Sequence, residues 1–357
     1  MADIRLAAGR KGDQMAKIKK AVTMTDIAKR MDVSTVTVSK ALSGQKGVSE
    51  EVREKILTLA VEMGYKHPHG SLADGRTSGY RIGVLMPSSA VATFDSFYWR
   101  LYQATSEKAM EKNCFTGYES LSVEMTSKKF LPRLVTDKMV DGLIVIGKPD
   151  GDYAAFLKER AGMPLVFLDD YDNGLDVDCF ISDSFYGTYL LTKYLLDRGH
   201  RDIAFVGTLF ATKSITDRYL GFQKAMMEQG LSVPGDHVIA DRGREKGTDE
   251  NYTSFSFPKK MPTAFVCNCD YVAGILIRNL KERGLRVPED VSVTGFDNYP
   301  GEKELGASVT TYAVDLQAMA KAAVKSLIRQ MNGENVKKGI HVIEGNLIEK
   351  HTVLPLV

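Results

Sequence analysis

The chain of 357 residues has no apolar run that approaches the roughly eighteen residues of a membrane-spanning helix. Its start, MADIRLAAGRKGDQMAK, lacks the apolar core of an export signal. We therefore expect a soluble, cytoplasmic protein without a membrane partner. Four cysteines are too few for a disulfide framework in a chain of this length. Cys267 and Cys269 lie close together, but without nearby Cys or His partners they make a poor zinc site, and no metal or cofactor is expected.

The sequence signatures of several enzyme classes are missing as well. There is no G-x-G-x-x-G, no P-loop, no G-x-S-x-G and no H-E-x-x-H, so nucleotide chemistry and hydrolysis have no support. No catalytic set stands out at the ends of the expected strands, and we expect a protein that is not an enzyme. Hydrophobic residues make up 44% of the chain and prolines number only eleven, which allows sizeable cores. The length predicts two or three domains.

Charge is distributed unevenly along the chain. Residues 1–70 contain thirteen Lys and Arg against eight Asp and Glu, whereas the remainder is slightly acidic. A basic N-terminal part on an acidic body favours a polyanionic partner at that end. Solvated basic faces are common, so the charge becomes informative only together with a nucleic-acid-binding motif.

The stretch MDVSTVTVSKAL, residues 31–42, has conflicting local signals. Its valines alternate with Ser and Thr, which favours a strand. Helical patterns precede and follow it, however, so a strand here would have no partner. As a helix that starts after Ser34, a good N-cap, the stretch has one apolar arc and one small polar arc that carries Lys40. This pattern predicts a helix-turn-helix, whose second helix enters the major groove of DNA.

We expect three helices in this part of the chain, over residues 25–32, 35–43 and 50–64. Thr23 or Thr25 can cap the first helix. Ser49 can cap the third, which has acidic residues in its first turn, where the helix dipole favours anions. Gly64 is expected to end the third helix.

The run from residue 22 to residue 66 resembles the headpiece of the LacI/GalR family of bacterial transcription repressors. It contains the family's T-x-x-D-I-A, V-S-x-x-T-V-S-K-x-L, V-S-x-x-V-R and closing G-Y patterns. The resemblance implies contacts with base edges for Thr35, Val36 and Lys40. It implies contacts with phosphate for Thr23, Ser34, Thr37 and Ser39. Lys40 stands where the family often has Arg, so the bidentate contact with guanine is lost.

The linker after the headpiece departs from the family pattern. Family members carry a hinge that folds on operator DNA and wedges a Leu pair into the minor groove. Here the linker reads YKHPHGSLADGRTSGYRIGVL, which is shorter and contains Gly70. Leu72 is the expected wedge. The alternative is a flexible linker in which this leucine has no such role.

Beyond residue 79, continuous apolar runs such as RIGVLMP, DGLIVIG and VSVTGFD alternate with helical patterns. This alternation predicts parallel sheets covered on both faces, with ligands at the carboxyl ends of the strands. The resemblance continues over residues 22–353 and implies a two-subdomain sensor similar to a periplasmic sugar-binding protein. The expected fold class is therefore α/β: a three-helix helix-turn-helix headpiece followed by a doubly wound, periplasmic-binding-protein-like sensor.

The expected domains follow from these patterns. Residues 1–21 form a disordered basic arm, 22–66 the DNA-binding headpiece, 67–79 the hinge, and 80–357 the effector-binding and dimerisation domain. Within this last domain we expect an N-subdomain of about 80–182 and 310–338 and a C-subdomain of about 183–309 and 339–357. The crossovers between subdomains are expected near 181–183, 308–311 and 337–341. Met15 resembles a family N-terminus, so residues 1–14 are interpreted as an arm or an upstream start.

Seven residues at or near strand ends are the candidate effector contacts: Phe97, Tyr98, Asp169, Asp183, Arg218, Cys269 and Asp297. The resemblance assigns Arg218 and Asp297 to positions where relatives hold their effector, and a buried Arg–Asp set suits a polyhydroxylated ligand. Relatives have an effector-contacting Asn where this chain has Cys269, which puts that hydrogen bond in doubt. Alternatives remain open: the aromatic pair can be core, Asp169 and Asp297 can cap loops, and Arg218 can be a structural ion-pair residue.

We therefore expect a homodimeric transcription factor, most simply a repressor, that binds pseudo-palindromic operator DNA under the control of a small effector, a sugar or sugar derivative. Effector closure of the sensor would disorder the hinges. The rival interpretation is a carbohydrate- or solute-binding protein with the same sensor fold and no regulatory role.

Overall fold

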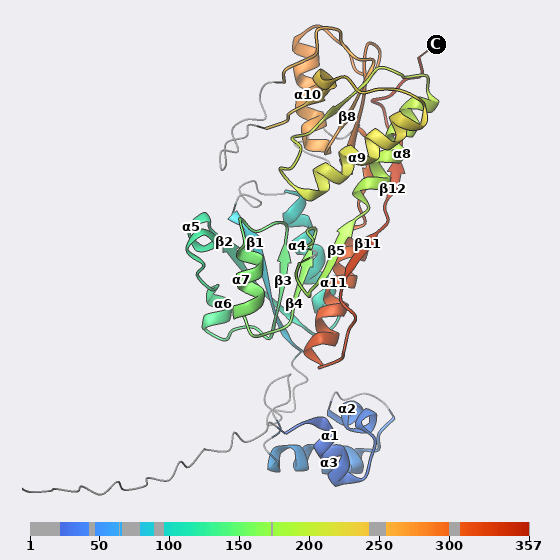
Figure 1. Cartoon of the computed structure of the whole chain (residues 1–357). Helices are drawn as coiled ribbons and strands as arrows, with labels where there is room; N and C mark the ends of the chain where they lie inside the picture. The colour runs from blue at the N-terminus through green and yellow to red at the C-terminus, as the bar shows by residue number, and fades with distance from the viewer. Residues whose placement is uncertain are drawn as a thin grey trace, which may run out of the picture. The chain divides into compact units, whose positions relative to one another are not determined.

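The computed structural model describes residues 22–42, 47–63, 65, 79–88, 96–172, 174–242, 255–299 and 308–356. The chain divides into two compact units, Met1–Ser78 and Gly79–Val357, which are described separately (Figure 1). The expected basic arm, Leu72 and the rest of the hinge before residue 79 lie outside the described residues, as does Gly64.

The headpiece contains the three expected helices: α1 (Met24–Met31), α2 (Thr35–Leu42) and α3 (Glu50–Glu62). The strand-like stretch is therefore helical, as the argument from its missing partner predicts. Val38 and Ala41 of α2 are buried against Ile27 of α1 and Ile56 of α3. Tertiary packing of this apolar arc outweighs the strand propensity of valine and threonine.

Side-chain caps fix where these helices begin. Thr23 and Asp26 form a reciprocal capping box at the start of α1, so Thr23 rather than Thr25 is the cap. The Ser34 hydroxyl accepts a hydrogen bond from the Thr37 N–H at 3.0 Å and thereby caps α2, as predicted. Ser49 caps α3 by accepting from the N–H of Val52.

The sensor unit contains two six-stranded sheets. The first sheet has the order β11-β5-β4-β3-β1-β2, and all of its neighbouring strands pair in parallel. Its strands are β1 (Arg81–Pro87), β2 (Phe115–Leu121), β3 (Gly142–Ile146), β4 (Leu165–Leu168), β5 (Asp178–Ser182) and β11 (Ile340–Ile343). The second sheet has the order β12-β10-β9-β8-β6-β7, in which only β12 is antiparallel. Its strands are β6 (Ile203–Val206), β7 (Val238–Ile239), β8 (Ala264–Cys267), β9 (Ser292–Asp297), β10 (Thr310–Ala313) and β12 (Asn346–Ile348).

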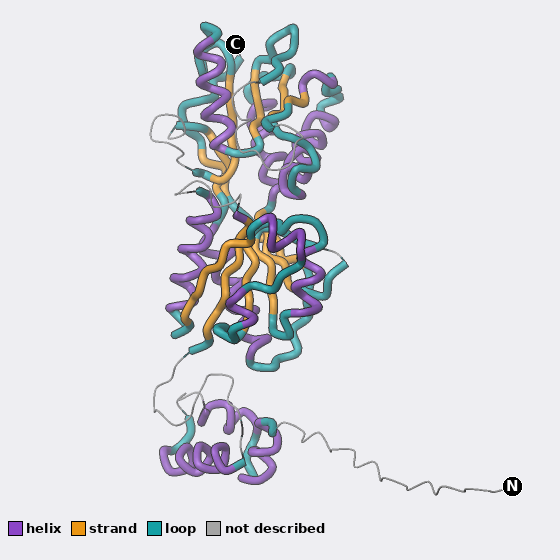
Figure 2. The backbone as a smooth tube through the Cα atoms, turned by 90° about the vertical axis from the view of Figure 1, so that its left-hand side faces the viewer, coloured by secondary structure: helices purple, strands orange, loops and turns teal. Residues whose placement is uncertain are grey.

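Helices cover both faces of each sheet, which explains the continuous apolar runs of the strands (Figure 2). On the first sheet, α4 and α11 pack on one face, and α6 and α7 contribute to the core on the other. On the second sheet, α10 packs on one face and α8 and α9 on the other. The helices of the sensor are α4 (Phe97–Met110), α5 (Val123–Lys128), α6 (Arg133–Thr136), α7 (Tyr153–Arg160), α8 (Ser184–Asp197), α9 (Lys213–Glu228), α10 (Asp270–Glu282) and α11 (Leu316–Met331), with the 3-10 turn η3 (Gly235–His237). The expected α/β class, with its headpiece and doubly wound sensor, is confirmed.

The chain passes between the two sheets three times. The first passage lies between Ser182 and Ser184, within the expected range. The second lies after β10 and the third after β11, so both come later in the chain than residues 308–311 and 337–341. The expected subdomain boundaries at 310 and 339 are therefore wrong. An apolar strand pattern predicts a strand, but it does not show with which of two similar sheets the strand pairs.

Two features are missing from the described residues. None of the described helices has the length and apolar character needed to cross a membrane. Within the same residues, no three His, Cys, Asp or Glu side chains come together as possible metal ligands.

Close packing of α8 and α9 depends on a glycine. A Cβ atom added at Gly221 would collide with the main-chain oxygen of Phe185 in α8. We expect Gly221→Ala to lower the free energy of unfolding by about 1–3 kcal/mol, because the two helices must separate. An added Cβ at Gly235 meets nothing within 4 Å, so the control Gly235→Ala should change stability by less than about 0.5 kcal/mol. Urea unfolding measures both, and equal stability of the two variants would contradict this packing.

Candidate functional site

The outward face of α2 carries the residues expected at the DNA. Thr35, Val36 and Ser39 are exposed, and the Val36 side chain is 61% exposed although it is apolar. Lys40 follows on the same helix and is half-buried. The exposed Val36 side chain can pack against a thymine methyl group, which would remove its apolar surface from water. The small hydroxyl side chains around it can form hydrogen bonds with base edges. The packed α1–α2 pair therefore presents a face suited to the major groove.

The capping hydroxyls are partly committed to the fold. The Thr23 hydroxyl donates to the Asp26 carboxylate at 2.7 Å and also accepts from the Asp26 N–H. Its one proton is therefore used within the capping box, and a phosphate contact from this side chain requires a rearrangement. The hydroxyls of Ser34 and Thr37 lie 2.9 Å apart, so only one of the two can donate to the other. One hydroxyl proton of that pair stays available for phosphate.

Arg53 of α3 stabilises the end of α2, a role that the sequence analysis did not assign. Its Nη1 donates to the carbonyl oxygens of Lys40 at 3.3 Å and Ala41 at 3.1 Å. Its Nε lies 3.4 Å from a carboxylate oxygen of Glu50. A cation at a helix C-terminus is favourable, and this one also fixes the segment that carries Lys40. The signal was present, because Arg53 belongs to the V-S-x-x-V-R pattern.

A cavity that is open to solvent lies between the two subdomains of the sensor, with about 360 Å³ of empty space including the solvent at its mouth. Its walls come from the carboxyl ends of strands in the first sheet and from the N-terminal turn of α9, as parallel α/β sheets predict. The lining residues are Tyr98, Lys148, Asp169, Asp170, Tyr171, Ile181, Ser182, Ser184, Thr212, Lys213, Ser214 and Asp217. Most of these side chains can form hydrogen bonds, which suits a polar ligand.

Tyr98 and Asp169 come together at this cavity, as expected. Tyr98 lies in the first turn of α4, and its hydroxyl is hydrogen-bonded to Asp169, which follows β4. Asp169 has φ of +64°, a conformation that is uncommon for residues other than glycine and is often found at functional sites. Burial, opposed by the positive charge of Arg218 and reinforced by the negative charges of Asp297 and Asp170, raises the pKa of Asp169 to about 7.

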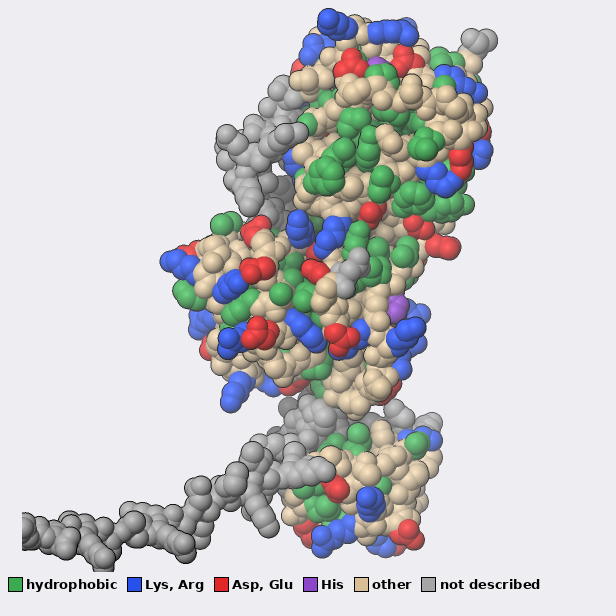
Figure 3. Space-filling model, in the orientation of Figure 1, with side chains coloured by type: hydrophobic (Ala, Val, Ile, Leu, Met, Phe, Trp, Pro, Cys, Tyr) green, Lys and Arg blue, Asp and Glu red, His purple; other side chains and the backbone are tan. Residues whose placement is uncertain are grey.

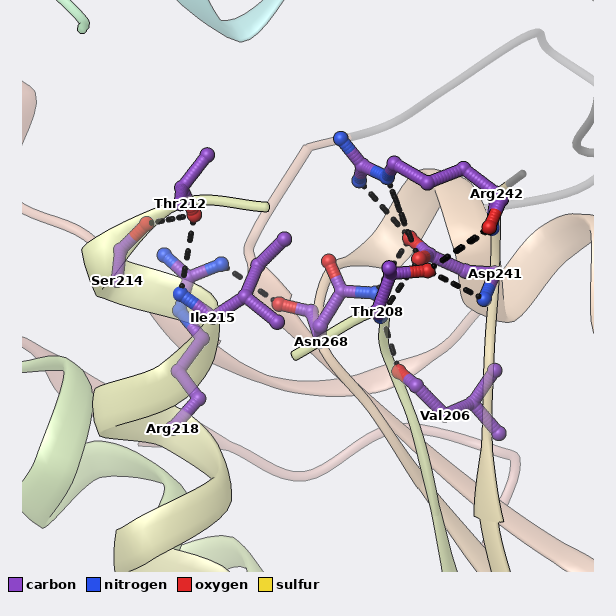
Figure 4. A network of polar contacts seen from close by, with 9 residues as sticks. All are labelled: Val206, Thr208, Thr212, Ser214, Ile215, Arg218, Asp241, Arg242 and Asn268. Carbon is purple, nitrogen blue, oxygen red and sulfur yellow. Dashed lines mark hydrogen bonds and ion pairs between the residues drawn. The ribbon is translucent and has the colours of Figure 1, made fainter. Parts of the chain in front are cut away.

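Arg218 and Asp297 form a buried ion pair on the second subdomain, near enough to Asp169 to affect its pKa but not among the residues that line the cavity. Nη2 of Arg218 lies 3.2 Å from Oδ1 of Asp297. Nη1 of Arg218 donates to the main-chain oxygen of Asn268 at 2.6 Å, as Figure 4 shows. The guanidinium also stacks on Phe296, with 3.8 Å from Cζ to the ring centre. Nε of Arg218 is buried and has no hydrogen-bond partner. A buried charged donor without a partner is costly, so this atom is well suited to hold a ligand.

The other three candidates lie elsewhere. Phe97 packs against the core of the first subdomain and contacts Tyr98 edge to face. Asp183 caps α8 by accepting from the Tyr186 N–H at 3.0 Å and does not line the cavity. Cys269 precedes α10, packs against the core of the second subdomain and does not line the cavity. Its burial raises the pKa of the thiol to about 12, so the side chain is neutral.

Four residues that sequence reasoning missed join the two subdomains beside the cavity. Nζ of Lys213 lies 3.2 Å from Oδ1 of Asp170 and donates to the main-chain oxygen of Tyr171. The Tyr171 hydroxyl donates to Asp217 at 3.2 Å. Basic and acidic side chains lie near one another where the two subdomains meet (Figure 3). The sequence did contain a signal for two of these residues. Lys213 and Asp217 are four residues apart on α9, so their side chains lie on the same face of the helix, the face that borders the cavity.

Comparisons with known proteins agree with both parts of this architecture. Residues 23–68 match the family described as bacterial regulatory proteins, lacI family, and residues 192–353 match the periplasmic binding protein-like domain. The chain therefore carries a DNA-binding domain of the lacI family together with a periplasmic-binding-protein-like domain.

Similar proteins cover nearly the whole chain. The HTH-type transcriptional repressor PurR of Escherichia coli O139:H28 is 29% identical over 339 residues, which is 93% of this chain and 96% of PurR. The lac repressor dimer bound to operator and the anti-inducer ONPF has a TM-score of 0.62 at 24% identity and covers 94% of this chain and 100% of its own. The transcriptional regulator CelR in complex with cellobiose has a TM-score of 0.64 at 19% identity, over 93% and 99% of the two chains.

The lacI-family DNA-binding domain decides between the interpretations left open by the sequence. The prediction of a LacI-type transcriptional regulator that is not an enzyme is confirmed. The rival, a solute-binding protein with the same sensor and no regulatory role, does not account for the DNA-binding family match at residues 23–68.

The raised pKa of Asp169 predicts a pH dependence of stability. Between about pH 4 and pH 7 the folded protein binds more protons at this carboxyl than the unfolded chain does, so stability falls as pH rises through about 7. Asp169→Asn should remove this slope, and urea unfolding at pH 5, 6, 7 and 8 measures it. Asp176 is a matched control, because Lys338 lowers the pKa of that exposed carboxyl and its titration lies below this range. If Asp169→Asn and Asp176→Asn retain the same slope as the wild type, Asp169 does not titrate as described.

Proposed function

We propose that this LacI-family protein is a homodimeric repressor whose affinity for operator DNA is controlled by a sugar or sugar derivative bound between the two sensor subdomains. The observation that carries the proposal is the buried Arg218, whose Nε lacks a protein partner beside a polar cavity. Because the same chain contains a DNA-binding headpiece, a ligand bound at this site can regulate DNA binding. Because its operator would lie on bacterial DNA, we place the protein in the cytoplasm.

The chemistry of the cavity supports a polyhydroxylated ligand. Asp169 and Asp297 can accept from hydroxyl groups, and Nε of Arg218 can donate to a hydroxyl oxygen. The Tyr98 ring offers an aromatic face at the same place. CelR, which shares the fold, binds cellobiose, and this relationship adds support for a sugar. Asp183 and Cys269 are not among the contacts that we propose.

The α4–β2 surface is our proposed part of the dimer interface. β2 is an edge strand, and edge strands that stay unpaired usually carry charges or bulges. Here Phe115 at its start is 79% exposed, and Met110 at the end of α4 is 70% exposed. Trp99 and Tyr118 are half-buried beside them and are in ring contact with each other. A second copy that covers this apolar surface would also bring two headpieces to a pseudo-palindromic operator.

The remaining DNA contacts are proposed on the same basis. Thr35, Val36 and Lys40 are the proposed base contacts, and Ser34, Thr37 and Ser39 the proposed phosphate contacts. Thr23 is a phosphate contact only if its capping box opens. Leu72 is the proposed minor-groove wedge.

Lys40→Ala should weaken operator binding by about 1–3 kcal/mol and relax the base preference at one operator position, because a base contact is lost. Selection of binding sites from a random DNA pool and fluorescence anisotropy with the best site measure both effects. Lys55→Ala is the matched control, since Lys55 lies on α3 and pairs with Glu51 at 2.7 Å. An unchanged base preference in Lys40→Ala would rule out this docking of α2.

Arg218→Ala should remove the response to effector by weakening its binding by about 2–4 kcal/mol, since a charged donor is lost from a buried site. Operator affinity without sugar should stay close to that of the wild type. The measurement is operator anisotropy during titration with a panel of sugars. Arg286→Ala, which breaks the exposed pair with Asp290 in the same subdomain, is the control and should respond normally.

Two results would contradict the role given to Arg218. A normal sugar response in Arg218→Ala would make it a structural ion-pair residue. Loss of operator binding without sugar would mean that Arg218 supports the fold or the dimer instead.

A further inference from the structure

Asp241, which follows β7, is a buried carboxylate outside the cavity. Its side chain is fully buried and accepts hydrogen bonds from the Thr208 N–H at 2.8 Å, Nδ2 of Asn268 at 2.9 Å and Nη2 of Arg242 at 2.8 Å. Figure 4 shows these partners converging on Asp241, with Asn268 between Asp241 and Arg218. A carboxylate with partners on several sides is held in one orientation.

Asp241 remains ionised despite its burial. Burial raises the pKa of this carboxyl, but hydrogen bonding to Arg242, its positive charge and the hydrogen bonds from Thr208 together outweigh that effect, and the pKa lies below its usual value. The bond to Asn268 is therefore charge-assisted, which makes it stronger than a bond between neutral groups.

Asn268 passes this constraint to the effector site. Its Nδ2 donates to Val206 O at 3.0 Å as well as to Asp241, and its own N–H donates to the same Val206 oxygen at 2.8 Å. The side chain and the main chain of Asn268 are thus both fixed. Its main-chain oxygen accepts the 2.6 Å hydrogen bond from Nη1 of Arg218. Neither Asp241 nor Asn268 lines the cavity.

We infer that Asp241 is a positioning residue for the effector pocket, acting through Asn268 on the guanidinium of Arg218. The guanidinium is planar, so fixing Nη1 on Asn268 and Nη2 on Asp297 also fixes the direction of Nε. Without the Asp241 carboxylate, the Asn268 amide loses a charged partner and the main-chain oxygen that holds Nη1 becomes mobile. The functional meaning of this inference rests on the proposed role of Arg218 as the effector anchor, but the positioning itself does not.

Arginine-selective ¹⁵N labelling of the full chain tests the inference without any ligand. In the wild type, Nη1 and Nη2 of Arg218 have different partners, so their hydrogens should give separate, slowly exchanging NMR signals. Arg218→Lys identifies these signals by their disappearance. In Asp241→Asn we expect the signals to merge and to exchange with solvent at least tenfold faster.

Two further variants make the outcome decisive. Asn268→Ser removes the amide that Asp241 holds but keeps the main-chain oxygen, so it should release Arg218 in the same way and decides the matter if Asp241→Asn does not fold. Asp290→Asn makes the identical substitution in a carboxylate that also pairs with an arginine, at 2.8 Å, and should leave Arg218 unchanged. Unaltered Arg218 signals in either pocket-side variant would overturn the inference. A failure of the proposed function would be seen separately, as a normal sugar response in Arg218→Ala.

Discussion

The sensor depends on how it accommodates one buried cation, the guanidinium of Arg218. Arg218 is only 6% exposed, and burial of a charged side chain is energetically unfavourable unless the charge is paired and hydrogen-bonded. Here the partners come from the ends of two neighbouring strands, with Asp297 and Phe296 from β9 and the main-chain oxygen of Asn268 after β8. The pair therefore holds the N-terminal half of α9 against the carboxyl edge of the second sheet. Nε is the guanidinium nitrogen that has no protein partner, so the residue that stabilises the subdomain also has a donor to offer a ligand.

The first subdomain faces this cation with negative charge. Asp169 projects from the end of β4 with its pKa raised to about 7, and its neighbour Asp170 pairs with Lys213 at the start of α9. A ligand between Asp169 and Arg218 would thus contact both subdomains at the place where they already meet. A change in their relative orientation can then be coupled to binding, provided that the ligand has different affinities for the two orientations.

Much of this structure could be predicted from the sequence, for identifiable reasons. The three headpiece helices follow from caps such as Ser34 and from the burial pattern of α2, although valine propensity alone favours a strand. Arg218 and Asp297 were predictable from motif and strand position, and they do pair. The sequence did not reveal that Asp183 caps α8, because a strand-end carboxylate and a helix N-cap look alike in sequence. The sheet assignment of β10 and β11, the Lys213–Asp170 pair and the Asp241–Asn268 bond depend on contacts between distant segments, which local patterns do not report.

The most direct test of this account is a crystal structure of the full chain with the sugar that changes operator binding most strongly. We expect the sugar between the two subdomains, with a hydroxyl oxygen about 2.7–3.2 Å from Nε of Arg218 and with the Arg218–Asp297 pair intact. A sugar bound elsewhere, or one in the cavity that leaves Nε of Arg218 without a partner, would contradict the claim that this buried cation anchors the effector.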